Sequence, residues 1–224
     1  MFIKKIDPNS FLLTVTNFLK NRIEALLHEK DTVYIALPGG STPMPILKLL
    51  AKEKLDWQRV FFYLTDERIV EIDNQENNFN RLNKFFFSKI NSISFPMYTG
   101  EISPTESCEN YIKKLEKLEQ FNKTPRFDLI VLGMGEDGHI ASLFPNSALL
   151  SEQNKWVALD PNERNGTTRM TLCFTILLNA SETILIARGT KKIKLLEKEE
   201  ARKNLPIETL LSQNQNLTVL CTMG

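Results

Sequence analysis

The sequence predicts an α/β fold in which a mostly parallel sheet is covered by helices on both faces. Short segments that are apolar from end to end alternate with segments of helical periodicity along the 224 residues. Strands of this kind are typical of parallel sheets buried between helices. Polar clusters directly follow the apolar segments, and parallel sheets bind ligands beyond the carboxyl ends of their strands. We expect a single domain over residues 1–224, since no repeat or linker interrupts it.

The first elements follow in order. Residues 10–29 carry an apolar stripe at helical spacing, with Ser10 as the expected N-cap. The segment TVYIALPGG (32–40) predicts a buried strand that ends in a glycine turn, and TPMPILKLLAK (42–52) predicts a helix. RVFFYLTDER (59–68) predicts a second strand with polar residues at its exit.

The second half continues the alternation. Residues 81–87 and TESCENYIKKLEKLEQF (105–121) predict helices, and FDLIVLGMG (127–135) predicts a third strand. ETILIARGTKKIKLLEKEEA (182–201) predicts a fourth strand that leads into a helix, and LTVLCTM (217–223) a last strand. The clusters PGGSTP, TDER, GEDGH and RGTKK all fall at strand exits, so we expect them to converge on one rim of the sheet.

The composition argues against several classes of protein. A net charge of +1, with 42% hydrophobic and 25% charged residues, gives no reason to expect a nucleic-acid or membrane partner. Three widely spaced cysteines without a CxxC pair make structural zinc and a disulfide scaffold improbable, and we expect no metal site. The start does not resemble a signal peptide, and no apolar run reaches the ~18 residues of a membrane span. We therefore expect a reduced, cytoplasmic, soluble protein.

The cluster PGGSTP favours an anion site. Gly39 and Gly40 are expected to adopt positive φ and to let the backbone approach a ligand closely, while Ser41 and Thr42 supply hydroxyls. Pro43 suits the first turn of a helix, whose free N–H groups can bind a phosphate. An ordinary strand-to-helix turn with a capping hydroxyl explains the same residues equally well. Because no Gly-Lys-Ser/Thr follows the glycines, nucleoside triphosphate binding is not expected.

Other strand exits carry groups that could bind an anion. In TDER, Arg68 could clamp an anion next to Asp66, although a solvated ion-pair turn is the simpler explanation of this cluster alone. Lys192 could reach a phosphate from the start of the last long helix, or it could be solvated like its neighbours. Arg169, which precedes another apolar stretch, is a weaker anion candidate.

The segment GMGEDGHIASLFP (133–145) carries the best candidate for a general base. His139 follows three glycines within six residues at a strand exit, and a neutral imidazole is suited to proton transfer near pH 7. Either Asp137 or Glu136 could orient the ring. No serine or cysteine is placed as an obvious nucleophile, and Ser142 is interpreted as a helix residue or local cap. Water is therefore the expected nucleophile.

The motifs LPGGSTP, LTDERIV and LGMGEDGHIASLFP, in this order and spacing, resemble the glucosamine-6-phosphate isomerase/6-phosphogluconolactonase family. The resemblance runs from the first strand through ARGTKK, which is most of the chain. The deaminase branch typically reads DGHIAFNEP, with an additional glutamate, and has an aromatic residue at the position of Arg68. DGHIASLFP and DERIV match the lactonase branch instead. Asn78 matches an asparagine of the family, and Asn146 replaces its usual glycine but tolerates a left-handed conformation.

The resemblance implies a three-layer α/β/α fold with a Rossmann-like sheet and no required metal or organic cofactor. It implies hydrolysis of 6-phospho-D-glucono-1,5-lactone to 6-phosphogluconate, in the oxidative pentose phosphate pathway, by a monomer or weak homo-oligomer. His139 would be the general base, supported by Asp137. The substrate and its phosphate would be bound by Gly39, Gly40, Ser41, Thr42, Asp66, Arg68, Arg169 and Lys192.

Two alternatives to this function remain open from the sequence. The first is a deaminase-like aldose-ketose isomerase acting on glucosamine 6-phosphate. The second is a phosphosugar-binding domain without catalysis, which usually comes with a DNA-binding segment. We do not expect such a segment before Ser10 or after Leu217.

Overall fold

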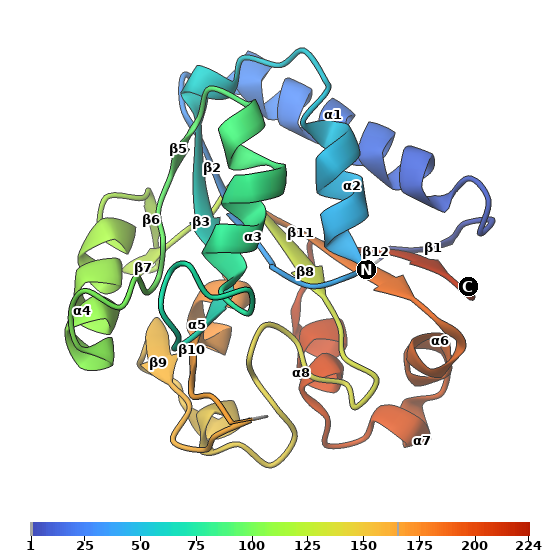
Figure 1. Ribbon diagram of the computed structural model, residues 1–224. Coiled ribbons are helices and arrows are strands. Elements are labelled where there is room, and N and C mark those ends of the chain that lie inside the picture. Colours follow the sequence, from blue (N-terminus) through green and yellow to red (C-terminus); the bar gives the residue numbers. More distant parts are fainter. Residues whose placement is uncertain (1, 165) are drawn as a thin grey trace.

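The computed structural model, which describes residues 2–164 and 166–224, has the predicted parallel sheet between helices (Figure 1). Its seven strands in the described residues lie in the order β1-β12-β11-β8-β2-β3-β5, and every neighbouring pair is parallel. The bounds of these strands are Phe2–Lys5 for β1, Val33–Leu37 for β2, Val60–Leu64 for β3, Ile93–Ser94 for β5, Leu129–Gly133 for β8, Glu182–Arg188 for β11 and Leu217–Thr222 for β12.

The strand order reverses between β8 and β2. From β2 the chain proceeds outward to β3 and β5, and from β8 it proceeds in the opposite direction to β11 and β12. Because crossovers between parallel strands are right-handed, helices of the two halves cover opposite faces of the sheet. In Figure 1, α1, α2 and α3 lie on one side of the sheet, and α5 and α8 lie on the other. Ligands bind at such a reversal point, at the carboxyl ends of the strands.

The helices other than α7 bury apolar side chains in one contiguous hydrophobic cluster. None in the described part of the chain is both long and apolar enough to cross a membrane. Their bounds are Phe11–Glu29 for α1, Pro43–Leu50 for α2, Asn78–Phe85 for α3, Pro104–Leu115 for α4, Phe174–Leu177 for α5, Thr190–Glu197 for α6, Glu199–Arg202 for α7 and Pro206–Gln213 for α8. Short 3₁₀ helices span Trp57–Arg59, Phe87–Lys89 and Ala148–Ser151.

A second, smaller sheet was not predicted. Strand β4 (Asp66–Arg68) follows β3 after one residue and pairs antiparallel with β10 (Arg169–Leu172), which pairs in turn with β9 (Val157–Leu159). The TDER cluster is therefore a strand and not an exposed turn. Alternation along β4 places Asp66 and Arg68 on one face and Glu67 on the other. A short hairpin of β6 (Gln120–Phe121) and β7 (Thr124–Pro125) completes the strands.

Several predicted boundaries were wrong for local reasons. Ser10 precedes α1, but its side chain makes no capping bond and its backbone is already helical. The helix predicted at 81–87 begins at Asn78, because the side chain of Asn77 accepts the N–H of Asn80 at 2.8 Å and caps it. The helix expected over 105–121 ends at Leu115, and the hairpin β6-β7 follows it. Strand β1 and helix α8 had not been predicted.

Candidate active site

A pocket of about 270 Å³ opens at the point where the strand order reverses. It brings together residues from all four clusters, PGGSTP, TDER, GEDGH and RGTKK, which were predicted to meet at one rim of the sheet. Its lining consists of Pro38, Gly40, Ser41, Thr42, Pro43, Asp66, Arg68, Asn78, Gly133, Met134, Gly135, His139, Ala141 and Lys192. Gly39, Asp137 and Arg169, which had been predicted as site residues, are not among the lining residues.

His139 and Asp137 form a hydrogen-bonded pair at the pocket. The Nδ1 atom of His139 lies 2.6 Å from Oδ1 of Asp137, and the backbone N–H of His139 donates to the same oxygen at 3.2 Å. Burial works to raise the pKa of Asp137, but the hydrogen bonds and charge of His139 outweigh it and lower that pKa. Because an ionised carboxylate can only accept, the Nδ1 proton points at Asp137 and Nε2 keeps its lone pair.

Two glycines allow this geometry. Gly138 has φ of +82°, a left-handed conformation that turns the chain directly before His139. At Gly135, a Cβ atom would lie 2.2 Å from Nδ1 of His139 and 2.4 Å from Oδ1 of Asp137, so only glycine leaves room for the pair. Glu136, the other carboxylate considered for the ring, instead pairs with Lys191 at 2.9 Å. The carboxylate that orients the His139 ring is therefore Asp137 and not Glu136.

The ring of Phe144 packs on His139, a contact that the sequence reasoning missed. The two ring centroids are 4.5 Å apart at an interplanar angle of 44°. The guanidinium of Arg164 lies 4.9 Å from the centroid of the same phenyl ring. An apolar ring thus occupies the position where the DGHIAFNEP pattern carries its glutamate. The difference between the ASLFP and AFNEP patterns was the signal that could have identified this neighbour.

The PGGSTP turn lies at the N-terminus of α2, as predicted, with Pro43 in the first turn. The expectation of positive φ at Gly39 and Gly40 is wrong, because neither is among the left-handed residues. What Gly39 provides is space, since a Cβ there would lie 2.1 Å from Oδ1 of Asn78. The side chain of Thr42 makes no capping bond to the helix, so its hydroxyl can form a hydrogen bond with a ligand.

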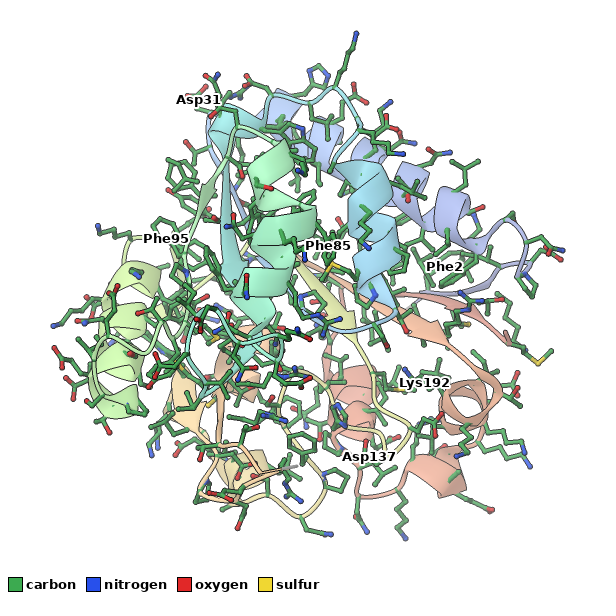
Figure 2. The ribbon with its side chains drawn as sticks, viewed as in Figure 1. Phe2, Asp31, Phe85, Phe95, Asp137 and Lys192 are labelled. Carbon is green, nitrogen blue, oxygen red and sulfur yellow. The ribbon has the colours of Figure 1, made fainter. Side chains whose placement is uncertain are left out.

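Arg68, on β4, and Lys192, on α6, supply positive charge to the pocket. Nη1 of Arg68 donates to the backbone oxygen of Glu76 at 2.7 Å and to its carboxylate at 3.2 Å, which holds the guanidinium at the rim. Burial lowers the pKa of Lys192, and the charges of Glu136 and Asp137 oppose that shift. Asp137 and Lys192 are labelled in Figure 2, on the loop after β8 and on α6. Cations at these positions suit a bound phosphate.

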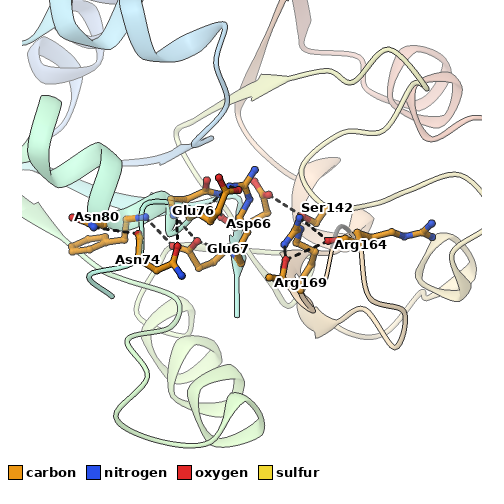
Figure 3. Close-up of polar contacts among 12 residues, drawn as sticks. Asp66, Glu67, Asn74, Glu76, Asn80, Ser142, Arg164 and Arg169 are labelled. Atoms are coloured by element: carbon orange, nitrogen blue, oxygen red, sulfur yellow. Dashed lines mark hydrogen bonds and ion pairs between the residues drawn. The ribbon is translucent and has the colours of Figure 1, made fainter. Parts of the chain in front are cut away.

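Asp66 is a buried carboxylate in the pocket lining, 9% exposed. Its Oδ2 accepts the hydroxyl of Ser142 at 2.8 Å (Figure 3), and its Oδ1 accepts that of Thr65 at 3.0 Å. The hydroxyl of Ser142 therefore bonds across to β4, and its interpretation as a local helix cap is wrong. These bonds fix the carboxylate with lone pairs left to accept hydroxyl groups of a sugar.

Arg169 is not among the residues that line the pocket, although it pairs directly with Arg68, which is. It is 5% exposed, sits opposite Arg68 in the β4-β10 pairing, and donates to the hydroxyl of Thr167 and to the backbone oxygen of Arg164. Burial, followed by the charge of Arg68, lowers the pKa of Arg169. In this arrangement Arg169 braces the second sheet, and its predicted contact with a phosphate stays a prediction.

Two residues of the site were missed as candidates. Asn78 lines the pocket, and Glu67, fully buried, lies behind it. Burial raises the pKa of Glu67 to about 8, against three backbone N–H donors that favour its charged form. Both residues lie in motifs that the sequence offered, TDER and the family asparagine. Among the described residues, no group of three His, Cys, Asp or Glu side chains could hold a metal ion.

The comparisons with known proteins identify the family. The family model described as glucosamine-6-phosphate isomerases/6-phosphogluconolactonase matches residues 6–219. A 6-phosphogluconolactonase from Thermotoga maritima is 33% identical over 207 residues, which is 92% of this chain and 90% of that protein.

Solved structures extend the likeness to the whole fold. A crystal structure of 6-phosphogluconolactonase from Thermotoga maritima has a TM-score of 0.84 at 30% identity, over 100% of this chain and 99% of that one. The 6-phosphogluconolactonase from Trypanosoma brucei has a TM-score of 0.85 at 25% identity, over 99% and 95% of the two chains. On the match over residues 6–219, the chain belongs to the glucosamine-6-phosphate isomerase/6-phosphogluconolactonase family.

Proposed function

We propose that the protein hydrolyses 6-phospho-D-glucono-1,5-lactone to 6-phospho-D-gluconate, the second step of the oxidative pentose phosphate pathway. The observation that carries the proposal is that His139, hydrogen-bonded to Asp137, lines a pocket that Arg68 and Lys192 also line. A base that can activate water thus lies beside groups that bind a phosphate. The similarity to lactonases from Thermotoga maritima and Trypanosoma brucei supports the same substrate.

His139 acts as the general base in this proposal. Its Nε2 takes a proton from a water molecule, whose oxygen forms a bond to the lactone carbonyl carbon. The tetrahedral intermediate collapses by breaking the bond between that carbon and the ring oxygen. The ring oxygen receives the proton from Nε2, which returns the imidazole to its neutral form. Asp137 stabilises the imidazolium between these two transfers.

The phosphate is held at the other end of the pocket. The Gly39–Thr42 turn offers backbone N–H groups and the hydroxyls of Ser41 and Thr42 at the N-terminus of α2. Arg68 and Lys192 add charge, and Asp66 accepts sugar hydroxyls. Binding the phosphate far from the carbonyl places the reacting carbon near Nε2. Because a lactone already reacts with water, positioning and one base, worth ~10²–10⁴ in rate, are sufficient.

The decisive experiment compares lactone hydrolysis above the spontaneous rate for the wild type, His139→Ala and His28→Ala. Hydrolysis is followed by NMR or by a coupled dehydrogenase. His28 is the other histidine of the chain and lies exposed near the end of α1, so it is a matched control. We expect about 10²–10⁴-fold lower kcat in His139→Ala and no change in His28→Ala. A wild-type rate equal to the spontaneous rate would reject the lactonase proposal.

The deaminase activity of the same family is the alternative, and ammonia release from glucosamine 6-phosphate tests it. Phe144 beside His139, in place of a glutamate, argues against that reaction. We further propose that residues 1–224 act as one domain, without a metal or organic cofactor, as a monomer or weak homo-oligomer. A cytoplasmic location stays a prediction, since related proteins of rice are described as chloroplastic.

A further inference from the structure

Glu67 is a buried carboxylate that the proposed reaction does not use. It lies in the middle of β4, between Asp66 and Arg68, and is 0% exposed. Because side chains alternate along a strand, its neighbours face the pocket while Glu67 faces the start of α3. A fully buried carboxylate is costly unless hydrogen bonds satisfy it, so its position calls for a structural reason.

The carboxylate of Glu67 binds the first turn of α3. Its Oε1 accepts the N–H of Asn78 at 2.6 Å and that of Arg68 at 2.7 Å, and its Oε2 accepts the N–H of Phe79 at 2.8 Å. The first N–H groups of a helix have no partner within the helix, and a carboxylate is the group that they favour. Glu67 therefore fixes α3 to β4 (Figure 3 shows it between these segments).

Asn78 connects the start of α3 to the pocket. Its Nδ2 donates to the backbone oxygen of Asp66 at 3.0 Å, and its Oδ1 lies against Gly39, where a Cβ would come within 2.1 Å. One side chain thus spaces β4 from the turn that follows β2. Both segments line the pocket on either side of Asn78.

We propose that Glu67 is a positioning residue that, through Asn78, sets the distance between the Gly39–Thr42 turn and the strand bearing Asp66 and Arg68. The inference rests on the proposed lactonase function, in which the turn and Arg68 bind the phosphate and Asp66 contacts the sugar. Without the hydrogen bonds of Glu67, α3 and Asn78 shift, and the Gly39–Thr42 turn and β4 no longer lie at the right distance from each other. The base is unaffected, because the loop after β8 carries His139 and Asp137.

Glu67→Gln tests the anchor with almost no change in volume. A glutamine has one acceptor oxygen, so its amide group must face at least one of the three N–H donors. We expect kcat/KM to fall by about 10- to 100-fold, through a lower kcat and a higher KM, because misplacement on the order of 1 Å has this effect. The pH profile of kcat should keep its wild-type shape, since His139 and Asp137 stay in place.

Asn78→Asp is the second variant, and it places an acceptor against the backbone oxygen of Asp66. We expect the same loss as in Glu67→Gln, and the double variant should lose no more than the worse single one, because both disturb the position of Asn78 between the turn and β4. Ser103→Ala is the control: it removes the side-chain cap of α4, which accepts the N–H of Glu106 at 3.2 Å, away from the pocket. It should lower the melting temperature and leave kcat/KM unchanged.

The outcomes separate the inference from the function. Wild-type protein without lactone turnover rejects the proposed function. Active wild type with unchanged kcat/KM in a folded Glu67→Gln variant, or independent losses in the double variant, rejects the positioning role. If circular dichroism shows that Glu67→Gln does not fold, Asn78→Asp becomes the test of the positioning role. Wild-type kcat/KM in Asn78→Asp then overturns the inference.

Discussion

Gly135→Ala is the sharpest test of the His139–Asp137 pair, because one methyl group is enough to displace it. Gly135 does not have a positive φ, so alanine is compatible with its backbone. The added Cβ would lie 2.2 Å from Nδ1 of His139, 2.3 Å from Cε1 and 2.4 Å from Oδ1 of Asp137. The substitution therefore acts through sterics at the proposed base and at its partner together.

The size of the effect follows from these contacts. An ordinary van der Waals contact requires about 3.4 Å, so the ring must move by about 1.2 Å from its 2.2 Å separation. A misplacement of about 1 Å in a catalytic group costs on the order of 10²-fold in rate. A shift of that size also breaks the 2.6 Å hydrogen bond between Nδ1 and Asp137. We expect kcat to fall about 100-fold, with a much smaller change in KM.

The assay is lactone hydrolysis above the spontaneous rate, with Gly133→Ala as the matched control. A Cβ at Gly133 would meet Pro43 at 3.8 Å, an ordinary contact, and the residue lies two positions earlier in the same segment. We expect Gly133→Ala to keep most of the activity. If Gly135→Ala folds and keeps the wild-type kcat, His139 in this position is not the base and the reasoning fails.

Three further predictions concern charge, pH and backbone conformation. Lys192→Met should raise KM for the lactone and weaken inhibition by inorganic phosphate with little change in kcat, because it removes a charge from the pocket and not from the reacting atoms. Because burial raises the pKa of Glu67 from 4.5 to about 8, the folded protein binds more protons than the unfolded chain between these values. The free energy of unfolding of the wild type should therefore fall as pH rises through this window. Denaturant titrations at several pH values should show a weaker pH dependence of this free energy for Glu67→Gln, and the same pH dependence in both proteins would contradict the prediction. Asn146 has φ of +63°, so Asn146→Val should destabilise the protein by about 1–2 kcal/mol and Asn146→Gly should not. Thermal unfolding measures this difference, and equal melting temperatures of the two variants would contradict the prediction.

The sequence was sufficient for the inner strands β12, β11, β8, β2 and β3, because such apolar segments have few alternatives, but not for the edge strands β1 and β5. Val33–Leu37 and Leu129–Gly133 are strands at the predicted places, and the clusters after them meet in one pocket. The convergence could be predicted because parallel strands end at one edge. The left-handed conformation tolerated by Asn146 was also predicted from its residue type, and the observed φ of +63° confirms it.

Contacts between distant segments could not be predicted in this way. The strand β4 pairs with β10, about a hundred residues later, so TDER could not be distinguished from a turn by local pattern. The choice of Asp137 over Glu136 depends on which carboxylate faces the ring across a tight turn. The burial of Arg169 next to Arg68 likewise depends on the pairing of the second sheet.

The sequence by itself determined the alternation of strands and helices, the rim at which polar groups gather, and the family motifs. These depend on residue type and spacing over short stretches. Only the tertiary structure decided which groups touch: Asp137 with His139, Ser142 with Asp66, and Glu67 with the start of α3. The first contact depends on the conformation of a tight turn, and the other two depend on how the packing of the core brings separate segments together.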